Sequence, residues 1–457
     1  TTRPETMLGD TAVAVNPEDE RYQKFIGREI TLPLQNRRLP IISDQSIDKT
    51  FGTGAVKITP AHDLLDAEIG ERHRLPLLQV VGSDGKMTKE AGTICENLNT
   101  KECRAKVLEE LRAKGFIERE EPYAHNIAVC YRCDSVIEPL PSPQWFLKMD
   151  KLAKVALQAV KSGKTKFHPS RWEKTYSEWL KNVKDWPISR QLWWGQKIPL
   201  KGEEDVLDTW FSSALWPLAV LGWPENSKDF KVFYPTQVLS TARDIINLWV
   251  TRMIFSGLEF TKKTPFKDII IHATILTKDG KRMSKSLGTG IDPIELIGRY
   301  GADATRFGLI WQAMGGQDIH WSEEHVNAGK KFANKIWNAS RFVLMNLQAT
   351  CLPDRQASYK LQAKPKTPAD KKILKELKVV TKKTTKKIES YEFGPALHDL
   401  YEFFWHNFCD KYIESAKIQL ADKKRATNTR QILFYVLTES LKLLHPFMPF
   451  VTEEIWG

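Results

Sequence analysis

Two short apolar segments on either side of a helix-like stretch constrain the fold of this chain more than any other feature. Residues 233–241 and 267–272 have the pattern of strands, and the second segment contains the apolar run 269–271. Residues 244–260 between them have the length and apolar spacing of an amphipathic helix. A strand, a helix and a strand in this order predict a βαβ unit with a parallel sheet. This region is therefore expected to be α/β, with ligands bound beyond the carboxyl ends of the strands.

The region before this unit has a different pattern. Residues 1–138 mix turns with short β-rich runs at 11–15, 55–59 and 77–81. They contain one clear helix, 100–114, which Gly115 ends in the C′ position. These features predict a compact α+β or β-barrel-like module. Residues 139–188 then become helical and rich in Trp, which suggests a connector.

The C-terminal third is predicted to be helical. Its first helix carries apolar residues three and four apart on one face: Phe332, Ile336, Ala339, Val343 and Leu347. Pro395 suits the first position of a later helix, and residues 431–444 form a further helical run. Helices joined by short links predict an up-down bundle.

The composition limits the class of protein. The chain has 457 residues and a net charge of +12, from 68 Lys plus Arg and 56 Asp plus Glu. A hydrophobic content of 42% is enough for several buried cores. No apolar run approaches the roughly 18 residues of a membrane span and no signal-peptide pattern is found, so we expect neither a membrane nor a secreted protein. Six Cys are too few for a disulfide framework in a chain of this size, which predicts a cytoplasmic location.

A Lys-rich helix in the C-terminal third is the strongest basic patch of the sequence. Its lysines are Lys371, Lys372, Lys375, Lys378, Lys382, Lys383, Lys386 and Lys387. Such a helix either contacts a polyanion such as RNA or is a solvated basic face. We expect Lys371, Lys375, Lys378 and Lys382 to contact RNA.

The loop after the second predicted strand carries residues suited to phosphate chemistry. It contains Arg282, Met283, Ser284, Lys285 and Ser286. A helix follows at Asp292 and Pro293, where Asp suits the N-cap and Pro the first helical position. Two cations beside small hydroxyls can clamp a triphosphate and stabilise charge on a departing pyrophosphate. The alternative is an ordinary Lys- and Ser-rich surface loop.

This loop resembles the KMSKS loop of class I aminoacyl-tRNA synthetases, with Arg282 where the first Lys usually stands. Five other stretches narrow the resemblance to the valyl-tRNA synthetase family: TTRPETMLGD (1–10), ISRQLWWG (188–195), DVLDTWFSSALWP (205–217), WNASRFV (337–343) and HPFMPF (445–450). The resemblance covers essentially the whole chain, in order. It implies that a first Rossmann half with a HIGH motif precedes residue 1 and that a coiled coil follows residue 457, so we expect the chain to be a fragment. No His-x-Gly-His sequence occurs in the chain.

The resemblance implies four parts. These are an editing domain at 1–138, a helical connector at 139–200, the second half of a Rossmann catalytic domain at 201–321 and a helical anticodon-binding domain at 322–457. The fold class expected for the whole chain is thus α/β multidomain, with a β-rich editing domain and an all-α bundle.

An editing domain fits the chemistry of valine selection. A hydrophobic pocket rejects threonine poorly, because threonine differs from valine only by a hydroxyl. A second site must therefore hydrolyse the wrong ester. Asp63 and Asp66 are three residues apart and can lie on one helical turn. The resemblance implies that Asp66 holds the substrate ammonium and that Asp63 supports hydroxyl recognition, whereas the alternative is an acidic helix start. By the same resemblance, the other pocket residues are Thr1, Arg3, Thr6, Phe51 and Lys57.

In the catalytic half, the resemblance implies a valine pocket formed by Trp210, Ile245 and Trp249. Two indoles and a β-branched side chain make a small apolar slot that excludes isoleucine by size. Ordinary core packing is the alternative for these three residues. Asp244 resembles the acidic contact to the nucleotide ribose, and His272 lies where the adenine is expected.

Two departures from the family are visible. Ala242 and Ala273 stand where glycine is common, so their Cβ atoms could crowd the nucleotide. Cys130 and Cys133 resemble half of a zinc site, but no second pair follows residues 193–194. We therefore expect two reduced thiols rather than zinc, and no metal site in the chain.

The function implied is that of a valine–tRNA ligase that uses ATP with Mg²⁺ to activate valine and transfers it to tRNA(Val). The protein is expected to be a monomer that also removes threonine from mischarged tRNA(Val). Arg282, Ser284, Lys285 and Ser286 are the expected catalytic residues, with Lys285 also binding ATP. The alternatives are a stand-alone editing hydrolase that binds tRNA without ligase activity, and a degenerate paralogue that only binds RNA.

Overall fold

In the computed structural model, which describes residues 1–130, 133–283, 288–347 and 363–457, the strand–helix–strand pattern forms a parallel sheet. Strand β10 (Thr236–Ala242) pairs with β11 (Phe266–His272), and β11 pairs on its other side with β6 (Lys166–His168). All three strands are parallel, which confirms the α/β prediction. The first strand starts three residues later than predicted, because residues up to Phe233 belong to a short helix, α7 (Lys228–Phe233).

The predicted helix between these strands has three parts. A 3₁₀ turn (Arg243–Ile245) leads into a π-helical stretch (Ile246–Val250) and then into α8 (Thr251–Thr261). Its buried face packs with α3 (Asp150–Lys161) in one core. The π-helical stretch widens the backbone where the predicted ligand-facing residues lie, a feature often found at functional sites.

The chain divides into two compact units, Thr1–Gln144 and Trp145–Gly457. Residues 145–200, predicted to be a helical connector, belong to the second unit. They contain α3 and α4 (Trp172–Lys181), and they also supply strand β6 to the parallel sheet. A three-residue strand beside a Pro gives too little periodicity to be recognised in the sequence.

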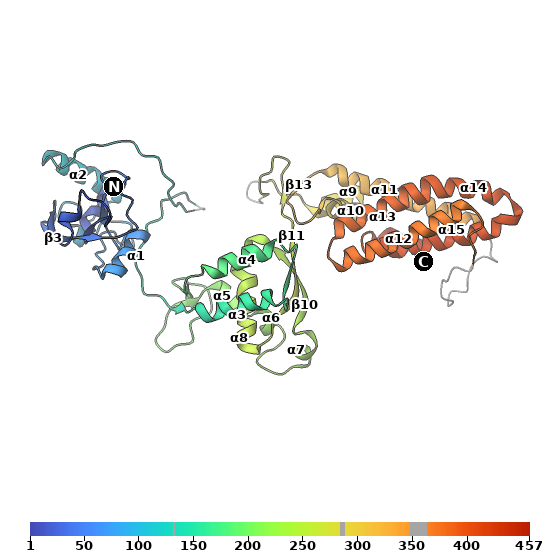
Figure 1. Cartoon of the computed structure of the whole chain (residues 1–457), viewed down its shortest axis with the longest axis horizontal. Coiled ribbons are helices and arrows are strands. Elements are labelled where there is room, and N and C mark those ends of the chain that lie inside the picture. Colours follow the sequence, from blue (N-terminus) through green and yellow to red (C-terminus); the bar gives the residue numbers. More distant parts are fainter. Residues whose placement is uncertain (131–132, 284–287, 348–362) are drawn as a thin grey trace. The chain divides into compact units, whose positions relative to one another are not determined.

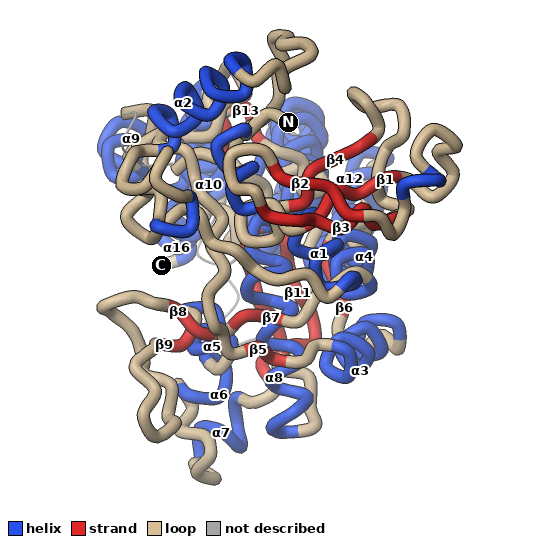
Figure 2. The backbone as a smooth tube through the Cα atoms, turned by 90° about the vertical axis from the view of Figure 1, so that its left-hand side faces the viewer, coloured by secondary structure: helices blue, strands red, loops and turns tan. Residues whose placement is uncertain are grey.

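The first unit is α+β. Its four-stranded sheet has the order β2 (Glu29–Leu32), β3 (Arg37–Ser43), β1 (Ala12–Val15), β4 (Ala55–Ile58), and Figure 2 shows these strands side by side. The strand predicted at residues 77–81 is absent; within this described stretch only Val81 forms an isolated bridge, to Met87. The predicted helix is α2 (Thr100–Ala113), ended by Gly115 at φ +70°. A further helix, α1 (Leu64–His73), starts at the helical turn expected for Asp63 and Asp66, but its length was not predicted.

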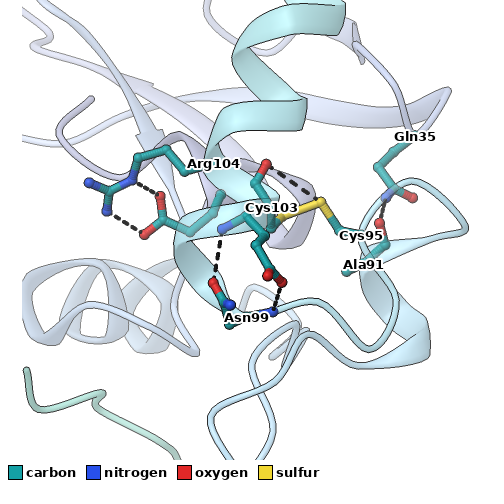
Figure 3. Close-up of a disulfide and its surroundings, with 8 residues drawn as sticks. Gln35, Ala91, Cys95, Asn99, Cys103 and Arg104 are labelled. Carbon is teal, nitrogen blue, oxygen red and sulfur yellow. Dashed lines mark hydrogen bonds and ion pairs between the residues drawn. A yellow bond between two sulfur atoms is a disulfide. The ribbon is translucent and has the colours of Figure 1, made fainter.

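A disulfide joins Cys95 and Cys103 in the first unit (Figure 3). Their Cα atoms are 5.1 Å apart, and both side chains are fully buried in the core beneath α2. The low cysteine content predicted no disulfide framework, and this prediction did not include the Cys95–Cys103 bridge. Spacing along the sequence could not show that the start of α2 folds back onto Cys95.

The predicted helical bundle is confirmed. Its helices run alongside one another in Figure 1. They are α10 (Ala302–Gln312), α11 (Glu323–Asn346), α12 (Pro368–Glu389), α13 (Phe393–Tyr401), a π-helical continuation (Glu402–Ile413), α14 (Glu414–Ala421), α15 (Lys423–Leu444) and α16 (Pro449–Trp456). Pro395 lies at the third position of α13 rather than the first. In the described part of the chain, no helix is long and apolar enough to cross a membrane.

Candidate functional site

A buried polar cluster surrounds Lys57 in the first unit. Lys57 lies in β4, and its Nζ donates to the Thr6 hydroxyl at 3.0 Å and lies 3.4 Å from Asp10 Oδ1. The same ammonium contacts the hydroxyl of Thr59, which in turn donates to Asp10. Thr6, Asp10 and Thr59 are all buried. One ammonium thus joins two threonine hydroxyls and a carboxylate below the surface.

Asp66 adds a second carboxylate to this cluster. It lies in the first turn of α1, is 8% exposed and accepts a hydrogen bond from the Thr59 backbone N–H at 2.8 Å. Burial raises the pKa of Asp66. Burial also raises the pKa of Asp10 to about 6, although the charge of Lys57 and the bond from Thr59 oppose this shift. The cluster can therefore hold and release protons in the weakly acidic range.

A row of charges adjoins this cluster. The Thr6 hydroxyl donates to the Arg3 carbonyl at 3.0 Å, and the Arg3 guanidinium contacts Glu5 at 3.2 Å. Arg104, next to the disulfide in Figure 3, binds Glu5 through two hydrogen bonds of 2.8 and 2.9 Å. Burial alone would raise the pKa of Glu5, but the bonds and charge of Arg104 outweigh it and lower that pKa. Glu5 therefore stays ionised and holds Arg3 in place.

Three residues predicted for the editing pocket are not part of the Lys57 cluster. The Asp63 carboxylate caps α1, because its Oδ1 accepts from the N–H groups of Leu65 and Asp66 at 2.8 and 3.1 Å. Phe51 is 53% exposed and contacts the edge of the Tyr123 ring. Thr1 is exposed and accepts a hydrogen bond from the Arg3 N–H at 3.0 Å. Of the residues predicted for the editing pocket, the structure thus brings Thr6, Lys57 and Asp66 together with Arg3. Asp63 instead caps the start of α1, which was the alternative interpretation of this residue.

Asp10 and Thr59 were not predicted from the sequence. Thr59 follows Lys57 by two residues along β4 and its continuation, so their side chains point to the same side of the sheet. That alternation was a usable signal for Thr59. Asp10 is 47 residues from Lys57, and only the pairing of β1 with β4 brings the two together.

A cavity of about 510 Å³ lies on another side of α1. Its walls are mainly apolar and come from α1 and from residues 139–141, with Asp63, Glu71 and Arg74 among the lining residues. Thr6, Lys57 and Asp66 do not line this cavity. The polar cluster and the cavity are therefore separate features of the first unit.

In the second unit, the predicted nucleotide residues gather beyond the carboxyl ends of β10 and β11. Ala242 and His272 lie opposite each other at the ends of these strands. Asp244 follows in the 3₁₀ turn, and the Arg282 guanidinium pairs with its carboxylate at 2.9 Å. Both side chains are largely exposed, so a ligand can reach them. His272 Nδ1 lies 3.0 Å from the carbonyl oxygen of Ala273. Ser284, Lys285 and Ser286 lie outside the described residues.

The residues predicted to form the valine pocket come from two neighbouring helices. Trp210 lies in α5 (Thr209–Ala214), and Ile245 and Trp249 lie in the turn and π-helical stretch before α8. The Trp249 indole N–H donates to the Ser213 carbonyl at 3.0 Å, which ties the two helices together. All three side chains are half-buried. They are neither fully packed in the core nor fully solvated.

Asp208 fixes the start of α5, the helix that carries Trp210. Its buried carboxylate caps α5 by accepting from the Trp210 N–H at 3.2 Å. The other oxygen, Oδ2, accepts from Trp186 Nε1 and from Arg190, both at 2.9 Å. Asp208 was not predicted as a site residue from the sequence, although an Asp just before a short helix is a usual N-cap signal.

The predicted RNA-binding lysines share one face of α12. Lys371, Lys375, Lys378 and Lys382 are all exposed and follow one another at spacings of four, three and four residues. Within the described ranges, none of the four forms an ion pair. They form a continuous basic stripe.

Cys130 and Cys133 are free thiols at a turn. A hydrogen bond with Ser135 lowers the pKa of Cys133. Among the residues with described positions, no group of three or more His, Cys, Asp or Glu could hold a metal ion.

Two protein-family models match this chain. The family model for tRNA synthetases class I (I, L, M and V) matches residues 82–201 and 199–322. A second model, the anticodon-binding domain of tRNA ligase, matches residues 370–457.

Curated relatives match the whole chain. Valine--tRNA ligase of Carboxydothermus hydrogenoformans is 49% identical over 100% of this chain and 54% of that protein. The Thermotoga maritima valine--tRNA ligase is 47% identical over 100% of this chain and 55% of that protein. The chain thus spans about half the length of the curated relatives it matches.

A solved structure supports the fold. Mycobacterium tuberculosis methionyl-tRNA synthetase in complex with methionyl-adenylate has a TM-score of 0.60, with 19% identity over 75% of this chain and 67% of that one. Because the class I model alone covers more than half of the sequence, the chain belongs to the class I tRNA synthetases that comprise the I, L, M and V enzymes.

Proposed function

We propose that this chain acts as part of a valine–tRNA ligase, and that it also hydrolyses threonine from mischarged tRNA(Val). The observation that carries the proposal is the 49% identity to a valine--tRNA ligase over the full length of the chain. Within residues 1–457 we assign editing to 1–138, a connector to 139–200, half of the catalytic site to 201–321 and anticodon binding to 322–457.

In the ligase reaction, the valine carboxylate attacks the α-phosphate of ATP, pyrophosphate leaves, and valyl-adenylate then reacts with the tRNA 3′ end. Arg282 and Lys285 stabilise the negative charge on the departing pyrophosphate. Mg²⁺ would enter with ATP and would neutralise part of the charge of the ATP phosphates. Asp244 accepts a hydrogen bond from the ribose once ATP displaces Arg282 from its carboxylate, and His272 lies beside the adenine. Ala242 and Ala273 narrow the space for this nucleotide.

Selection of valine rests on Trp210, Ile245 and Trp249. The Trp249–Ser213 hydrogen bond fixes one indole, and the Asp208 cap fixes the helix that carries the other. A rigid slot of this kind rejects isoleucine because an added methylene has no room. It discriminates threonine from valine poorly, since the two side chains have nearly the same shape.

In this proposal the Lys57 cluster is the editing site, where threonine that was attached to tRNA(Val) in error is hydrolysed. Asp66 is buried and negatively charged when ionised, so it suits the α-ammonium of the misplaced amino acid. Asp63 Oδ1 is occupied by the cap of α1, whereas Oδ2 has no hydrogen-bond partner among the described residues and is available for the threonine hydroxyl. Thr1, Arg3 and Phe51 border the entrance in this proposal, and a bound water attacks the ester.

The α12 stripe supplies phosphate contacts for tRNA. Lysines neutralise phosphates and release counterions, which contributes affinity without reading sequence. A net charge of +12 is consistent with a polyanionic partner.

The test is deacylation by the purified 1–457 chain. Threonyl-tRNA(Val) and valyl-tRNA(Val) are each incubated with the protein, and release of the amino acid is followed. We expect threonine to be released faster than valine, and an excess of uncharged tRNA(Val) to inhibit more than an equal excess of tRNA(Leu). Equal release of both amino acids, or equal inhibition by both tRNAs, would contradict the proposal.

A further inference from the structure

Arg252 is a buried cation whose charge is only partly balanced. It lies in the first turn of α8 and is 7% exposed. Its guanidinium carbon lies 3.6 Å from the centroid of the Trp186 ring, and its Nη1 is 3.4 Å from Asp208 Oδ2. The Nε has no hydrogen-bond partner among the described residues. A buried donor without an acceptor is costly, so this N–H points to a missing partner.

The nearby carboxylate cannot be that partner alone. Asp208 Oδ2 already accepts from Arg190 at 2.9 Å and from the Trp186 indole at 2.9 Å. One carboxylate therefore faces two guanidinium groups, which leaves an excess of one positive charge. Burial, together with the charge of Arg190, lowers the pKa of Arg252 to about 10, although the charge of Asp208 opposes this.

A cavity of about 190 Å³ opens beside this guanidinium. Its lining residues are Met149, Trp179, Asn182, Val183, Lys184, Asp185, Trp186, Pro187 and Arg252. Lys184 adds a second cation to the wall. Asp185 is the acidic residue in this wall, and its Oδ1 already accepts from the Met149 N–H at 3.0 Å. The cavity is smaller than the roughly 300 Å³ at which pockets begin to hold drug-sized molecules, so it suits a small ion better than a nucleotide.

We propose that this cavity binds a small tetrahedral oxyanion of the phosphate type, held by Arg252 and Lys184. A guanidinium stacked on an aromatic ring keeps its edge free for in-plane hydrogen bonds to an oxyanion, which is the geometry that favours Arg over Lys in phosphate recognition. The Nε supplies one such bond, and the ammonium of Lys184 supplies charge. The site contains none of the residues assigned to valine selection and does not depend on that assignment.

Thermal unfolding followed by Trp fluorescence tests the proposal on the chain as it stands. All 15 Trp lie in residues 145–457, so the signal reports only the unit that contains the cavity. Sodium phosphate is compared with sodium chloride at equal ionic strength. At tenfold excess over Kd, a single site in a unit of this size should raise Tm by about 2 °C beyond the chloride control. No additional rise with phosphate would overturn the proposal.

The variants separate binding from a general salt effect, since phosphate also stabilises proteins by exclusion from their surface. Arg252→Lys keeps the charge but removes the planar donor edge, so the phosphate-specific rise should vanish. The matched control is Arg306→Lys in the same unit, where the guanidinium donates to the carbonyls of Pro446 and Phe447, and it should keep the rise. An equal rise in both variants would show that the effect is general.

Two further experiments complete the test of phosphate binding. If Arg252→Lys does not fold, Lys184→Gln is used, for which we expect phosphate affinity to fall at least twofold by calorimetry; unchanged affinity would overturn the proposal. Glycerol phosphate then distinguishes the sources of the anion. Weaker binding than that of inorganic phosphate assigns the site to the free ion, and tighter binding assigns it to a terminal phosphate group.

Discussion

The Lys57 ammonium lies 3.4 Å from Asp10 Oδ1, and both groups are largely removed from water. A buried pair of this kind gains little net stability when intact, but removing one partner leaves the other charge uncompensated. This ion pair therefore determines how the stability of the first unit changes when Lys57 or Asp10 is replaced.

We expect Lys57→Met to destabilise the first unit by about 3 kcal/mol, because Asp10 then loses its counter-charge. The double variant Lys57→Met/Asp10→Asn should recover part of this loss. The first unit contains no Trp, so its unfolding is best followed by deuterium exchange of peptides from β4 in a urea titration. A double variant that is less stable than Lys57→Met would contradict this view of the pair.

Asp10 and His62 should make opposing contributions to the pH dependence of the first unit's stability. The Asp10 pKa rises on folding to about 6, so its contribution to stability is fully present below its unfolded value and is lost as pH rises through about 6. Burial, together with the charge of Arg3, lowers the pKa of His62 to about 4. The stabilising contribution of His62 is thus present above about 6.5 and is lost as pH falls through about 4.

Between about pH 4 and 6 the two contributions should largely cancel. Asp10→Asn should therefore make stability rise with pH in this window, and His62→Gln should make it fall. Urea titrations at each pH, read by a deuterium pulse at one fixed pH, measure both slopes. Slopes of the same sign in the two variants would refute the opposition.

Asp66→Ala should slow threonine release from threonyl-tRNA(Val) by roughly 10- to 150-fold. The α-ammonium then loses its buried counter-charge, and a charge-assisted hydrogen bond of this kind contributes roughly 1.5–3 kcal/mol. Asp63→Ala should instead reduce the preference for threonine over valine and destabilise α1 by about 1 kcal/mol through loss of the cap. Deacylation of both esters is measured, with circular dichroism as the folding control. A folded Asp66→Ala variant with full activity would show that this pocket assignment is wrong.

Binding of tRNA should depend steeply on salt through the α12 stripe. Replacing Lys371, Lys375, Lys378 and Lys382 by Gln should lower the slope of log K against log salt by about 3 to 4, if each lysine contacts one phosphate. Four exposed lysines outside this stripe, Lys24, Lys86, Lys114 and Lys228, provide a control of equal charge. If both quadruple variants change the slope equally, the stripe is only a solvated face.

Purified 1–457 should not catalyse valine-dependent ATP–pyrophosphate exchange. The nucleotide site proposed for it contains Asp244, His272 and Arg282, and the sequence contains no His-x-Gly-His motif. Because phosphoryl-type chemistry depends on positioning several groups around the phosphates, half a site should be inactive. Exchange at a rate typical of a whole synthetase would require a different catalytic arrangement.

The sequence predicted those elements whose residues show strong periodicity. The apolar run 269–271 identified β11, and Asp292 with Pro293 identified the start of α9 (Pro293–Tyr300), where Asp292 accepts from the Ile294 N–H. The length of helix α1 was not predicted, because Ile69 is its one large apolar residue that is buried while Leu64 and Leu65 are exposed, so no apolar face repeats along it. Such a helix is specified by its Asp63 cap and its tertiary contacts rather than by its pattern.

The candidate sites were predicted only where a motif or a resemblance marked them. Lys57 and Asp66 were found in this way, and the structure adds that they share the buried Thr59. Asp10, Asp208 and the Arg252 cavity were missed, because each depends on contacts between residues far apart in the chain. Local spacing carries no information about such contacts.

Strand β6 has a consequence for how this protein can be divided. Thr165 donates to the Phe266 carbonyl at 2.7 Å and His168 pairs with Asp268 at 2.8 Å. Segments about 100 residues apart in the sequence are therefore neighbours in one sheet. If residues 201–321 were expressed alone, β11 would present a bare edge, the usual starting point for aggregation. A protease cut in the loop at residues 191–205 would instead leave two pieces that remain bound through one shared sheet. The boundary proposed near residue 200 is therefore not a point at which the second unit divides into two separately folded parts.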